Sequence, residues 1–425
     1  MPSAGRRIQI ASDVADIALG WPQKVSLHEI MGSEFERASI GADTVDIVSI
    51  GKMARELMRA ARALLGAKIR HSLTITAPQN GVAACDELIG DHPIPTARSM
   101  LAGKALVEFV AAGRGSSTPV IFLVSGGTSS VCVAPTPPVT LPDLQAIWHA
   151  ALAAGIDVTR LNQLRAAVSR IHGGGILRLC RDRASWSFIV VDNVQSGIEW
   201  VGSGLTFPYE PDRQLVGELL RVLALDADVG ARIWDAVGAR AQMNEAELVR
   251  RHENWVIADT SLSLQVATET AINKGYHVVS MGGKVQGDVR LLARRFGEYL
   301  AQPELRGRRV CILGAGEGTV QVRGQGRGGR CQELALRMGR ELVSARGYAY
   351  FAAAASDGQD HLPGVGGAWV DSFSWDRINA LSSVDVERAM ADNDSYNVLR
   401  RVGGLLPGVP TGWNLCDIYV LCAEE

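Results

Sequence analysis

The sequence lacks any apolar stretch long enough to cross a membrane. Its longest strongly apolar run covers residues 348–355, whereas a membrane-spanning helix needs about 20 residues. The N-terminal segment also lacks the pattern of a signal peptide, because Asp13 and Asp16 interrupt the apolar region that such a peptide requires. We therefore predict a cytoplasmic protein that does not interact with membranes.

The sequence also lacks a charge excess and any cysteine motif. Lys and Arg number 43 and Asp and Glu 45, for a net charge of −2, which gives no general electrostatic attraction to nucleic acid. The seven cysteines are scattered without a C-x-x-C or Cys/His ligand spacing. Reduced thiols are the better interpretation than disulfides or a zinc site.

What the sequence does contain is typical of a globular α/β protein. It has 425 residues, 47% of them hydrophobic and 21% charged, and 46 glycines, a length that suggests two or three domains. Short β-branched runs at 45–51, 120–127 and 186–193 alternate with longer helical stretches, which predicts mainly parallel strands. Strand-like segments resume at 255–259, 277–283, 309–316, 319–324 and 348–358 after a polar helical region. We place a domain boundary near residues 230–255.

The strongest candidate site is the Gly/Arg loop, residues 318–330. Arg323, Arg327 and Arg330 alternate there with glycines that include Gly328 and Gly329, and a helix is predicted to follow. Glycine lets backbone N–H groups approach a ligand, a helix N-terminus favours anions, and guanidinium groups bind phosphate or carboxylate at two points. The segment therefore indicates an anion site, although a flexible basic surface loop is the alternative.

A second glycine loop follows the strand at 120–124. Ser125, Gly126, Gly127 and Ser129 could offer donors to a phosphate. The loop lacks the Walker spacing, and an ordinary strand-to-helix turn would also explain it. The segment at 313–318 contains three glycines, but Thr319 stands where a dinucleotide-binding loop needs a further glycine, and residues 319–324 are predicted to form a strand instead of a helix. Both features argue against a nicotinamide site.

Several charged residues lie where predicted strands end. A carboxylate at Asp192, Asp357 or Asp360 could hold Mg²⁺ or accept a hydroxyl proton, but each could also cap a helix or begin a turn. Lys52 could place a positive charge at a strand end, or it could simply be solvated. The proline-rich loop around His92 favours a structural role for this residue.

Taken together, these segments resemble the class II glycerate kinases, also called glycerate 2-kinases, whose C-terminal half is the MOFRL domain. The resemblance runs from GKMARELM at 51–58 to PTGWNLCDI at 410–418, and GEGTVQVRGQGRGGRCQELAL at 316–336 is its most specific part. HPIPTARS (92–99), LVSGGTSS (123–130), LNQLRAAVSRIHGG (161–174), SDGQD (356–360) and NDSY (393–396) fall in the family's order.

The resemblance implies two α/β domains with an interdomain cleft: a Rossmann-like layered sheet at 1–240 and a smaller mixed MOFRL-type domain at 241–425. It also implies transfer of the γ-phosphoryl of ATP to the 2-hydroxyl of D-glycerate with a divalent metal, Mg²⁺. Some members carry the label hydroxypyruvate reductase, which leaves an NAD(P)-dependent reductase as an alternative. A role in tartrate degradation and a homodimer are further expectations.

Matching positions assign roles to residues. Lys52 and Arg330 correspond to catalytic basic residues and Asp192 to the catalytic aspartate. The glycine loops would bind the nucleotide through Ser125, Gly126, Gly127, Ser129, Arg323, Arg327, Gly328 and Gly329. Substrate would contact Asn162, Arg165, Asp357, Asp360 and Asn414, and a metal would bind Asp192 and Asp357.

The chain departs from the family at polar positions. Ser196 and Gly197 replace an acidic pair, Ala166 and Ala167 replace basic residues, Gly364 replaces an aspartate, and Trp413 replaces a small threonine. The hypothesis is that donor binding is kept while the acceptor differs from glycerate, for example a tetronate or another sugar acid. A catalytically impaired binding or regulatory protein is the alternative. No chemistry is assigned to residues 1–40.

Overall fold

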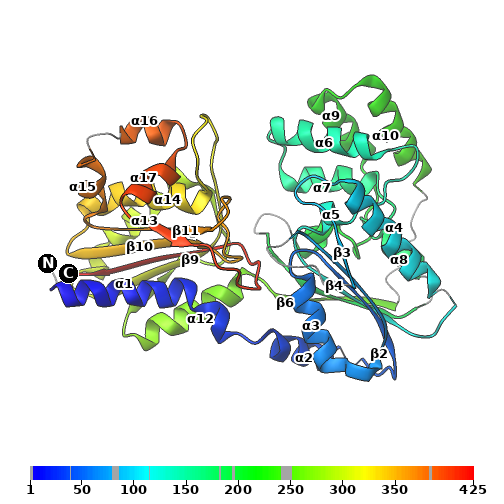
Figure 1. Ribbon diagram of the computed structural model, residues 1–425, viewed down its shortest axis with the longest axis horizontal. Helices are drawn as coiled ribbons and strands as arrows, with labels where there is room; N and C mark the ends of the chain where they lie inside the picture. Colours follow the sequence, from blue (N-terminus) through cyan, green and yellow to red (C-terminus); the bar gives the residue numbers. More distant parts are fainter. Residues whose placement is uncertain are drawn as a thin grey trace. The chain divides into compact units, whose positions relative to one another are not determined.

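The computed structural model describes residues 3–38, 40–78, 86–113, 115–180, 183–193, 197–240, 251–381 and 385–425. The chain divides into two compact units, each built on its own sheet (Figure 1). The parallel-sheet unit comprises mainly Ser26–Asp192 and Ser196–Ile257, and the mixed-sheet unit comprises mainly Met1–Val25 and Ala258–Glu425. Two α/β domains are therefore confirmed, and the cleft between them stays a prediction.

The division differs from the predicted ranges because the N-terminal segment belongs with the C-terminal half. Helix α1 (Ala4–Leu19) places Ile10, Val14 and Ile17 on one face, and all three are fully buried. Its buried Asp13 accepts hydrogen bonds from Arg309 Nη2 at 2.5 Å and from the Tyr276 hydroxyl at 3.0 Å. Partners this far along the chain give no signal in the local sequence.

The parallel-sheet unit has the strand order β3-β2-β1-β4-β5-β6. The strands are β1 (Val45–Ile50), β2 (Ile69–Thr76), β3 (Glu87–Ile89), β4 (Val120–Val124), β5 (Ser185–Val190) and β6 (His252–Ala258). Neighbouring strands from β3 to β5 pair in parallel. The chain leaves β1 toward β2 on one side and later returns with β4 on the other, so the carboxyl ends of β1 and β4 form a topological switch point, where open α/β sheets bind ligands.

Helices enclose this sheet and form a second layer beside it (Figure 1). The helices of the unit are α2 (Leu27–Arg37), α3 (Ala54–Leu65), α4 (Ala97–Ala112), α5 (Thr128–Val131), α6 (Leu141–Ala153), α7 (Val158–Ala167), α8 (Gly175–Cys180), α9 (Arg213–Leu223) and α10 (Ala227–Ala239). Strand side chains such as Val48 and Phe122 pack in one apolar core with α4 and α8. Helices α6, α7, α9 and α10 share another, around Trp148 and Ile233.

The mixed-sheet unit has the strand order β12-β11-β10-β13-β9-β7, with β8 paired to β9. Its strands are β7 (His277–Ser280), β8 (Val285–Asp288), β9 (Val310–Thr319), β10 (Tyr348–Ala355), β11 (Val365–Asp371), β12 (Leu405–Pro407) and β13 (Asp417–Glu424). Its remaining helices are α12 (Thr260–Asn273), α13 (Val289–Leu300), α14 (Arg330–Glu341), α15 (Ser374–Asn379), α16 (Val386–Ala391) and α17 (Ser395–Arg401). Strand β13 lies between β9 and β10 and is antiparallel to both. The end of β10 therefore lies beside the start of β13 and the end of β9.

One of two local predictions changed in the structure. Residues 313–318 continue inside β9 rather than forming a turn before a helix, which agrees with the argument against a nicotinamide loop there. The predicted strand at 319–324 was wrong, because β9 ends at Thr319. Beyond it, the backbone N–H groups of Arg323 and Gly324 donate to Asn393 Oδ1 instead of to a strand.

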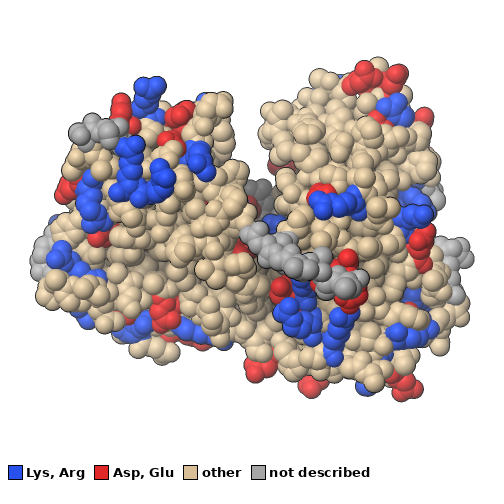
Figure 2. All heavy atoms as spheres, in the orientation of Figure 1, with Lys and Arg blue, Asp and Glu red and all other residues tan. Residues whose placement is uncertain are grey.

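The distribution of surface charges and the state of the cysteines agree with what the composition predicts. On the face shown in Figure 2, basic and acidic side chains are interspersed. Every cysteine in the described ranges is a free, buried thiol, as predicted, and Cys85 lies outside those ranges. Across the ranges that the structure describes, no helix combines the length and apolarity that a membrane span requires.

Candidate functional site

The loops after β1 and β4 are joined by hydrogen bonds at the switch point. Lys52 N donates to Gly126 O at 2.8 Å, and Met53 N donates to Ser125 Oγ at 3.1 Å. Gly51 has a φ of +115°, and a Cβ there would lie 2.4 Å from Ser125 Oγ. Since a side chain cannot fit between the loops, glycine allows Lys52 and the serine–glycine loop to occupy the same sheet edge.

The serine–glycine loop presents a row of backbone donors. Gly127 adopts a left-handed conformation with φ +85° directly before the short helix α5. Within the described part of the chain, the N–H groups of residues 126 to 129 donate no hydrogen bond. Successive N–H groups around a left-handed residue form a concave site for anions. The predicted phosphate-binding character of this loop is consistent with that geometry.

Asp192 and His92 lie directly against the same loop. A Cβ on Gly126 would lie 1.5 Å from Asp192 Oδ2, and one on Gly127 would lie 3.1 Å from Lys52 Cγ and 3.3 Å from His92 Cδ2. The loop can therefore carry no side chain at either position without displacing these residues. Lys52 and Asp192, predicted from separate segments, do share one edge of the sheet.

A polar network continues from this loop into α7. Arg165 Nη1 donates to Asn162 Oδ1 at 3.0 Å, and its guanidinium stacks on the Trp148 ring at 3.9 Å. The Ser203 hydroxyl lies 2.9 Å from Asn162 Oδ1 and 2.7 Å from Ser129 Oγ. Ser203 thus connects two predicted site residues, Ser129 and Asn162. A third, Arg165, is bonded to Asn162 and stacked on the Trp148 ring.

The electrostatics of this region favour a negatively charged ligand. Burial lowers the pKa of Arg165 to about 9, and none of the described carboxylates forms an ion pair with it. Burial, followed by the charges of Lys52 and Arg165, lowers the pKa of His92 to about 4. A ligand carboxylate or phosphate would supply the negative charge that these groups lack.

The Gly/Arg loop of the mixed-sheet unit is held by the chain itself. Gln325 N donates to Asp392 Oδ1 at 2.9 Å, Gly326 N to Asp392 O at 2.8 Å, and Arg327 N to Asp394 Oδ1 at 3.0 Å. A Cβ on Gly326 would lie 2.5 Å from Asp392 O. These glycines allow close packing against the turn before α17, so the loop's donors are used within the protein.

The N-terminus of α14 is likewise filled by a protein carboxylate. Asp360 accepts hydrogen bonds from Cys331 N at 3.2 Å and from Gln332 N and Nε2, both at 2.9 Å. A Cβ on Gly329 would lie 2.3 Å from Asp360 Oδ1. Burial, together with the charge of Asp417, raises the pKa of Asp360, although these hydrogen bonds act to lower it. The predicted anion site at this helix therefore holds an internal anion.

Arg330 is engaged by two carboxylates. Its Nε and Nη2 donate to Asp417 at 2.6 and 3.0 Å, and its Nη1 donates to Glu317. Burial alone would lower the pKa of Arg330, but the charge and hydrogen bonds of Asp417 and the charge of Glu317 raise it. The face of the guanidinium that would bind a phosphate at two points is thus occupied by Asp417.

The other predicted residues of this unit are dispersed around the same sheet edge and the loop. Asp357 Oδ1 accepts from Gln359 N at 2.9 Å, and Asn414 is buried just before β13. Arg323 donates to Gln321 Oε1, and Arg327 stacks on Tyr396 at 4.9 Å. Both arginines are exposed, and Gly328 packs against α17, with its Cβ position 2.1 Å from Ser395 Oγ.

The departures from the family have local explanations. Ala166 and Ala167 are fully buried, and Arg240 donates to the Ala166 carbonyl and, at 2.7 Å, to Gly173 O. Trp413 is buried against Trp21, with ring centroids 5.9 Å apart. An aspartate at Gly364 would be strained, since its φ is +75°. Gly197 is exposed, and Ser196 lies outside the described residues.

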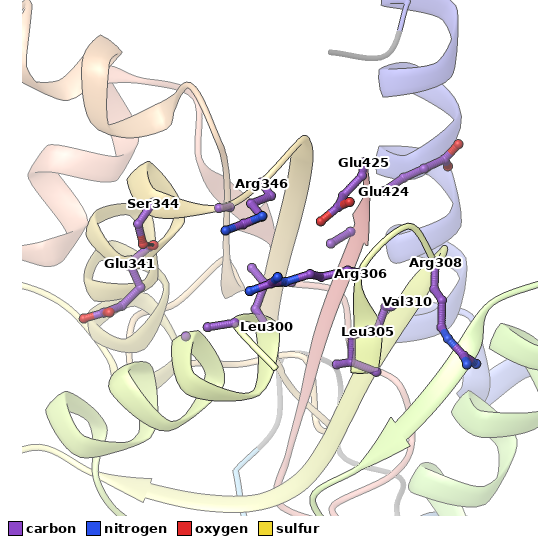
Figure 3. A pocket seen from close by; sticks show the side chains of 14 residues that line it. Leu300, Leu305, Arg306, Arg308, Val310, Glu341, Ser344, Arg346, Glu424 and Glu425 are labelled. Atoms are coloured by element: carbon purple, nitrogen blue, oxygen red, sulfur yellow. Dashed lines mark hydrogen bonds between the residues drawn. The ribbon is translucent and has the colours of Figure 1, made fainter. Parts of the chain in front are cut away.

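A separate pocket lies at the opposite end of the mixed sheet (Figure 3). The Arg306 and Arg346 side chains extend into it from different loops, and Glu425 lies nearby, where its Oε2 accepts from Gly307 N at 3.0 Å. None of the predicted site residues lines this pocket. Its arginines are on the surface, and we assign it no function.

Sequence reasoning missed several residues of these sites. Asp417 and Glu317 carried no signal, because each becomes important only as a partner of Arg330. Ser203 joins the network through contacts with Ser129 and Asn162 that its local sequence does not indicate. The proline-rich surroundings of His92 predict a structural role, and its place beside Lys52 depends on how β1 and β3 are arranged in the sheet.

Two family models match the chain. The model described as "Domain of unknown function (DUF4147)" matches residues 21–237, and the MOFRL family model matches residues 310–417. The glycerate 2-kinase of Pyrococcus horikoshii is 26% identical over 92% of this chain and 89% of its own length. The D-glycerate 2-kinase of Thermotoga maritima is 26% identical over 90% and 91% of the two chains, and human glycerate kinase is 28% identical over 88% and 83%.

Solved structures show the same fold. The crystal structure of glycerate kinase from Thermotoga maritima superposes with a TM-score of 0.83 and 22% identity, covering 98% of this chain and 99% of the other. A Pyrococcus horikoshii protein superposes with a TM-score of 0.71 and 25% identity, covering 90% and 88%.

Proposed function

This chain belongs to the family of glycerate 2-kinases in which a DUF4147 domain precedes a MOFRL domain, and from that premise we propose its reaction. The protein transfers the γ-phosphoryl group of ATP to a hydroxyl group of a small hydroxy acid, either glycerate or a related sugar acid. The curated relatives named above are glycerate kinases, which supports a phosphotransferase with an alcohol acceptor.

The observation that carries the proposal is the sheet edge of the parallel-sheet unit. The N–H groups of residues 126 to 129 make no hydrogen bond within the described chain, and Lys52 and the half-buried Arg165 lie in the same region. Phosphoryl transfer needs positioning and neutralisation of negative charge more than covalent help from the protein. An edge with several donors and two cations supplies both.

We assign the following roles within this edge. The serine–glycine loop binds phosphate oxygens through its N–H groups, and the Lys52 ammonium neutralises their charge. Arg165, held by Asn162 and Trp148, binds the carboxylate of the acceptor. Asp192 accepts the proton of the attacking hydroxyl group or orients it. The role of Arg330 in neutralising the transferred group stays a prediction.

The donor set fits a magnesium ion that arrives with the nucleotide. The described residues contain no group of three or more His, Cys, Asp or Glu side chains suited to a metal. Mg²⁺ usually binds through one or two carboxylates, with phosphates and water completing its shell. Asp192 could supply one such carboxylate, and the ion would stabilise charge on the phosphates. The role of Asp357 as a metal ligand stays a prediction.

The departures from the family favour, among the acceptors proposed above, a sugar acid longer than glycerate. The departures at Ala166, Ala167, Gly364 and Trp413 change polar groups, whereas Lys52, Asp192 and Arg165 are retained. A longer sugar acid such as a tetronate fits a site that keeps its cations and loses other polar contacts. The homodimer, the cytoplasmic location and the role in tartrate degradation stay predictions.

A coupled assay of ADP release tests the function. The purified protein is incubated with ATP, Mg²⁺ and a panel of D-glycerate, D-erythronate, D-threonate and tartrate. Acid-dependent ADP release supports a kinase. If acids shift the melting temperature but release no ADP, the protein is instead a binding or regulatory relative, which the lost polar residues would explain. Oxidation of NADH with hydroxypyruvate would favour the reductase.

A further inference from the structure

We propose that a small cavity beside Arg165 is part of the acceptor site and binds one carboxylate oxygen of the hydroxy acid through Nε2–H of His172 and Nε–H of Arg165. The proposal rests on the function proposed above and names the residues that recognise the acid. The cavity is lined by Ser129, Trp148, Arg165 and His172, with apolar side chains such as Leu144 forming other walls. It has room for about one oxygen-sized group.

The hydrogen bonds of Ser169 determine which nitrogen of His172 carries the proton. Ser169 Oγ accepts from Ile171 N at 3.2 Å and from His172 N at 3.1 Å, so both of its lone pairs are used. Its own proton then points to His172 Nδ1, 3.0 Å away. Nδ1 is therefore an acceptor, and the ring proton lies on Nε2.

The ring is neutral at physiological pH. Burial, followed by the positive charges of Arg165 and Arg240, lowers the pKa of His172 to about 3. His172 is only 2% exposed, and its neighbours Arg165 and Arg240 are both cationic. A neutral Nε2–H group is thus a fixed hydrogen-bond donor that does not add a third positive charge.

Two buried donors on residues that line this cavity have no acceptor. Neither His172 Nε2 nor Arg165 Nε finds a partner among the described residues. The Ser129 hydroxyl, which also lines the cavity, is already hydrogen-bonded with Ser203 at 2.7 Å. Buried donors are costly to leave without partners. Two such donors on residues lining one cavity are the reason for our inference that an oxygen atom from outside the chain completes the site.

Charge favours a carboxylate oxygen over a water molecule. Arg165 is half-buried with a fully buried Nε, and it has no ion pair among the described residues, whereas a charge withdrawn from water is normally paired. A carboxylate satisfies both donors and neutralises the guanidinium, whereas a water molecule satisfies donors only. The cavity also adjoins Ser129, whose backbone N–H belongs to the proposed phosphate loop, so that acid and phosphate would lie in one site.

Two substitutions of His172 separate the donor from the rest of the ring. His172→Asn keeps an acceptor near the position of Nδ1 for Ser169 but removes the donor at Nε2. His172→Gln places an N–H group near Nε2. His252→Leu is the matched control, since His252 is a buried histidine of the same unit whose Nδ1 lies 2.7 Å from Ser185 Oγ.

Binding is measured by the thermal shift that D-glycerate, D-erythronate and tartrate each produce without ATP, with glycerol as the probe that lacks a carboxylate. We expect His172→Asn to weaken binding of the best acid by at least about tenfold, the scale of one lost hydrogen bond to a charged group. His172→Gln should stay within about threefold of the wild type, since it keeps the donor. His252→Leu should lower the melting temperature but not acid affinity.

Three results would overturn the proposal. Equal acid affinity in His172→Asn and the wild type, with a lower melting temperature in the variant, would assign the cavity to a structural water. An equal loss of glycerol and acid binding would exclude carboxylate recognition. The absence of a shift with any acid would also count against it. Acid binding that depends on His172 without ADP release would leave this site intact and contradict the kinase function instead.

Discussion

Replacing Arg330 with alanine should reduce stability because it removes the counterion of a buried carboxylate. The Asp417 side chain is 0% exposed and receives two hydrogen bonds from Arg330, at 2.6 and 3.0 Å. In Arg330→Ala, Asp417 keeps the Tyr419 hydroxyl at 3.2 Å as a hydrogen-bond donor but loses the positively charged guanidinium beside it. The variant must then either bury an uncompensated charge or bind a proton.

The expected loss follows from the exposure of the two partners. Removing one member of a buried ion pair costs about 3–5 kcal/mol. The Arg330 side chain is 36% exposed, so that water can partly replace it, and we expect a decrease of about 2–3 kcal/mol in the free energy of unfolding. For a domain of this size that corresponds to roughly 4–12 °C in melting temperature.

A double-mutant cycle tests this reasoning. Urea unfolding is measured for the wild type, Arg330→Ala, Asp417→Asn and the double variant. Because the double variant contains neither charge, it should be more stable than the sum of the single losses predicts, with a coupling energy above about 1 kcal/mol. ADP release by the same proteins shows whether activity falls further than stability explains. Additive losses, or an Arg330→Ala variant as stable as the wild type, would refute the structural role.

Three further predictions concern the loops, the pH dependence and the lysine. Gly329→Ala should lower the free energy of unfolding by about 1–3 kcal/mol, because its Cβ would lie 2.3 Å from Asp360. Gly230→Ala in α10, where a Cβ would meet no atom within 4 Å, is the control and should raise the free energy of unfolding by about 0.5–1 kcal/mol. Urea unfolding measures both changes. The pKa of His172 is about 3 in the folded protein and about 6.5 in the unfolded chain, so only the unfolded chain binds a proton between these values. The contribution of neutral His172 to the free energy of unfolding is therefore complete above about pH 6.5 and falls by about 2 kcal/mol by pH 5. His172→Asn should therefore show a flatter stability profile, and an unchanged slope would contradict the assignment. Lys52→Ala should raise KM for ATP or lower kcat by at least about tenfold while changing the melting temperature little; a variant that unfolds more easily but keeps its turnover would make Lys52 structural.

Much of the fold follows from local sequence patterns. The strands β1, β4 and β5 were predicted because continuous β-branched runs are typical of a buried parallel sheet. Since carboxyl ends of parallel strands share one edge, the meeting of Lys52, the serine–glycine loop and Asp192 could also be anticipated. Local patterns could not place α1, whose Asp13 is paired with Arg309 far along the chain.

The Gly/Arg loop shows what residue types alone do not determine. Glycines, arginines and a helix N-terminus are the features of a phosphate site, and the sequence contains all of them. In the structure the donors bind Asp360, Asp392 and Asp394, and Arg330 binds Asp417. An internal carboxylate satisfies such donors as well as a ligand does. Which anion is bound depends on tertiary contacts that no spacing rule contains.

The most direct test of the account is a crystal structure with a non-hydrolysable ATP analogue, Mg²⁺ and the best acid from the panel. The account predicts phosphate oxygens within hydrogen-bond distance of the N–H groups of residues 126 to 129, and the acid's carboxylate at Arg165 and His172. Triphosphate bound instead to the N–H groups of the Gly/Arg loop, with Asp360 displaced from α14, would contradict it.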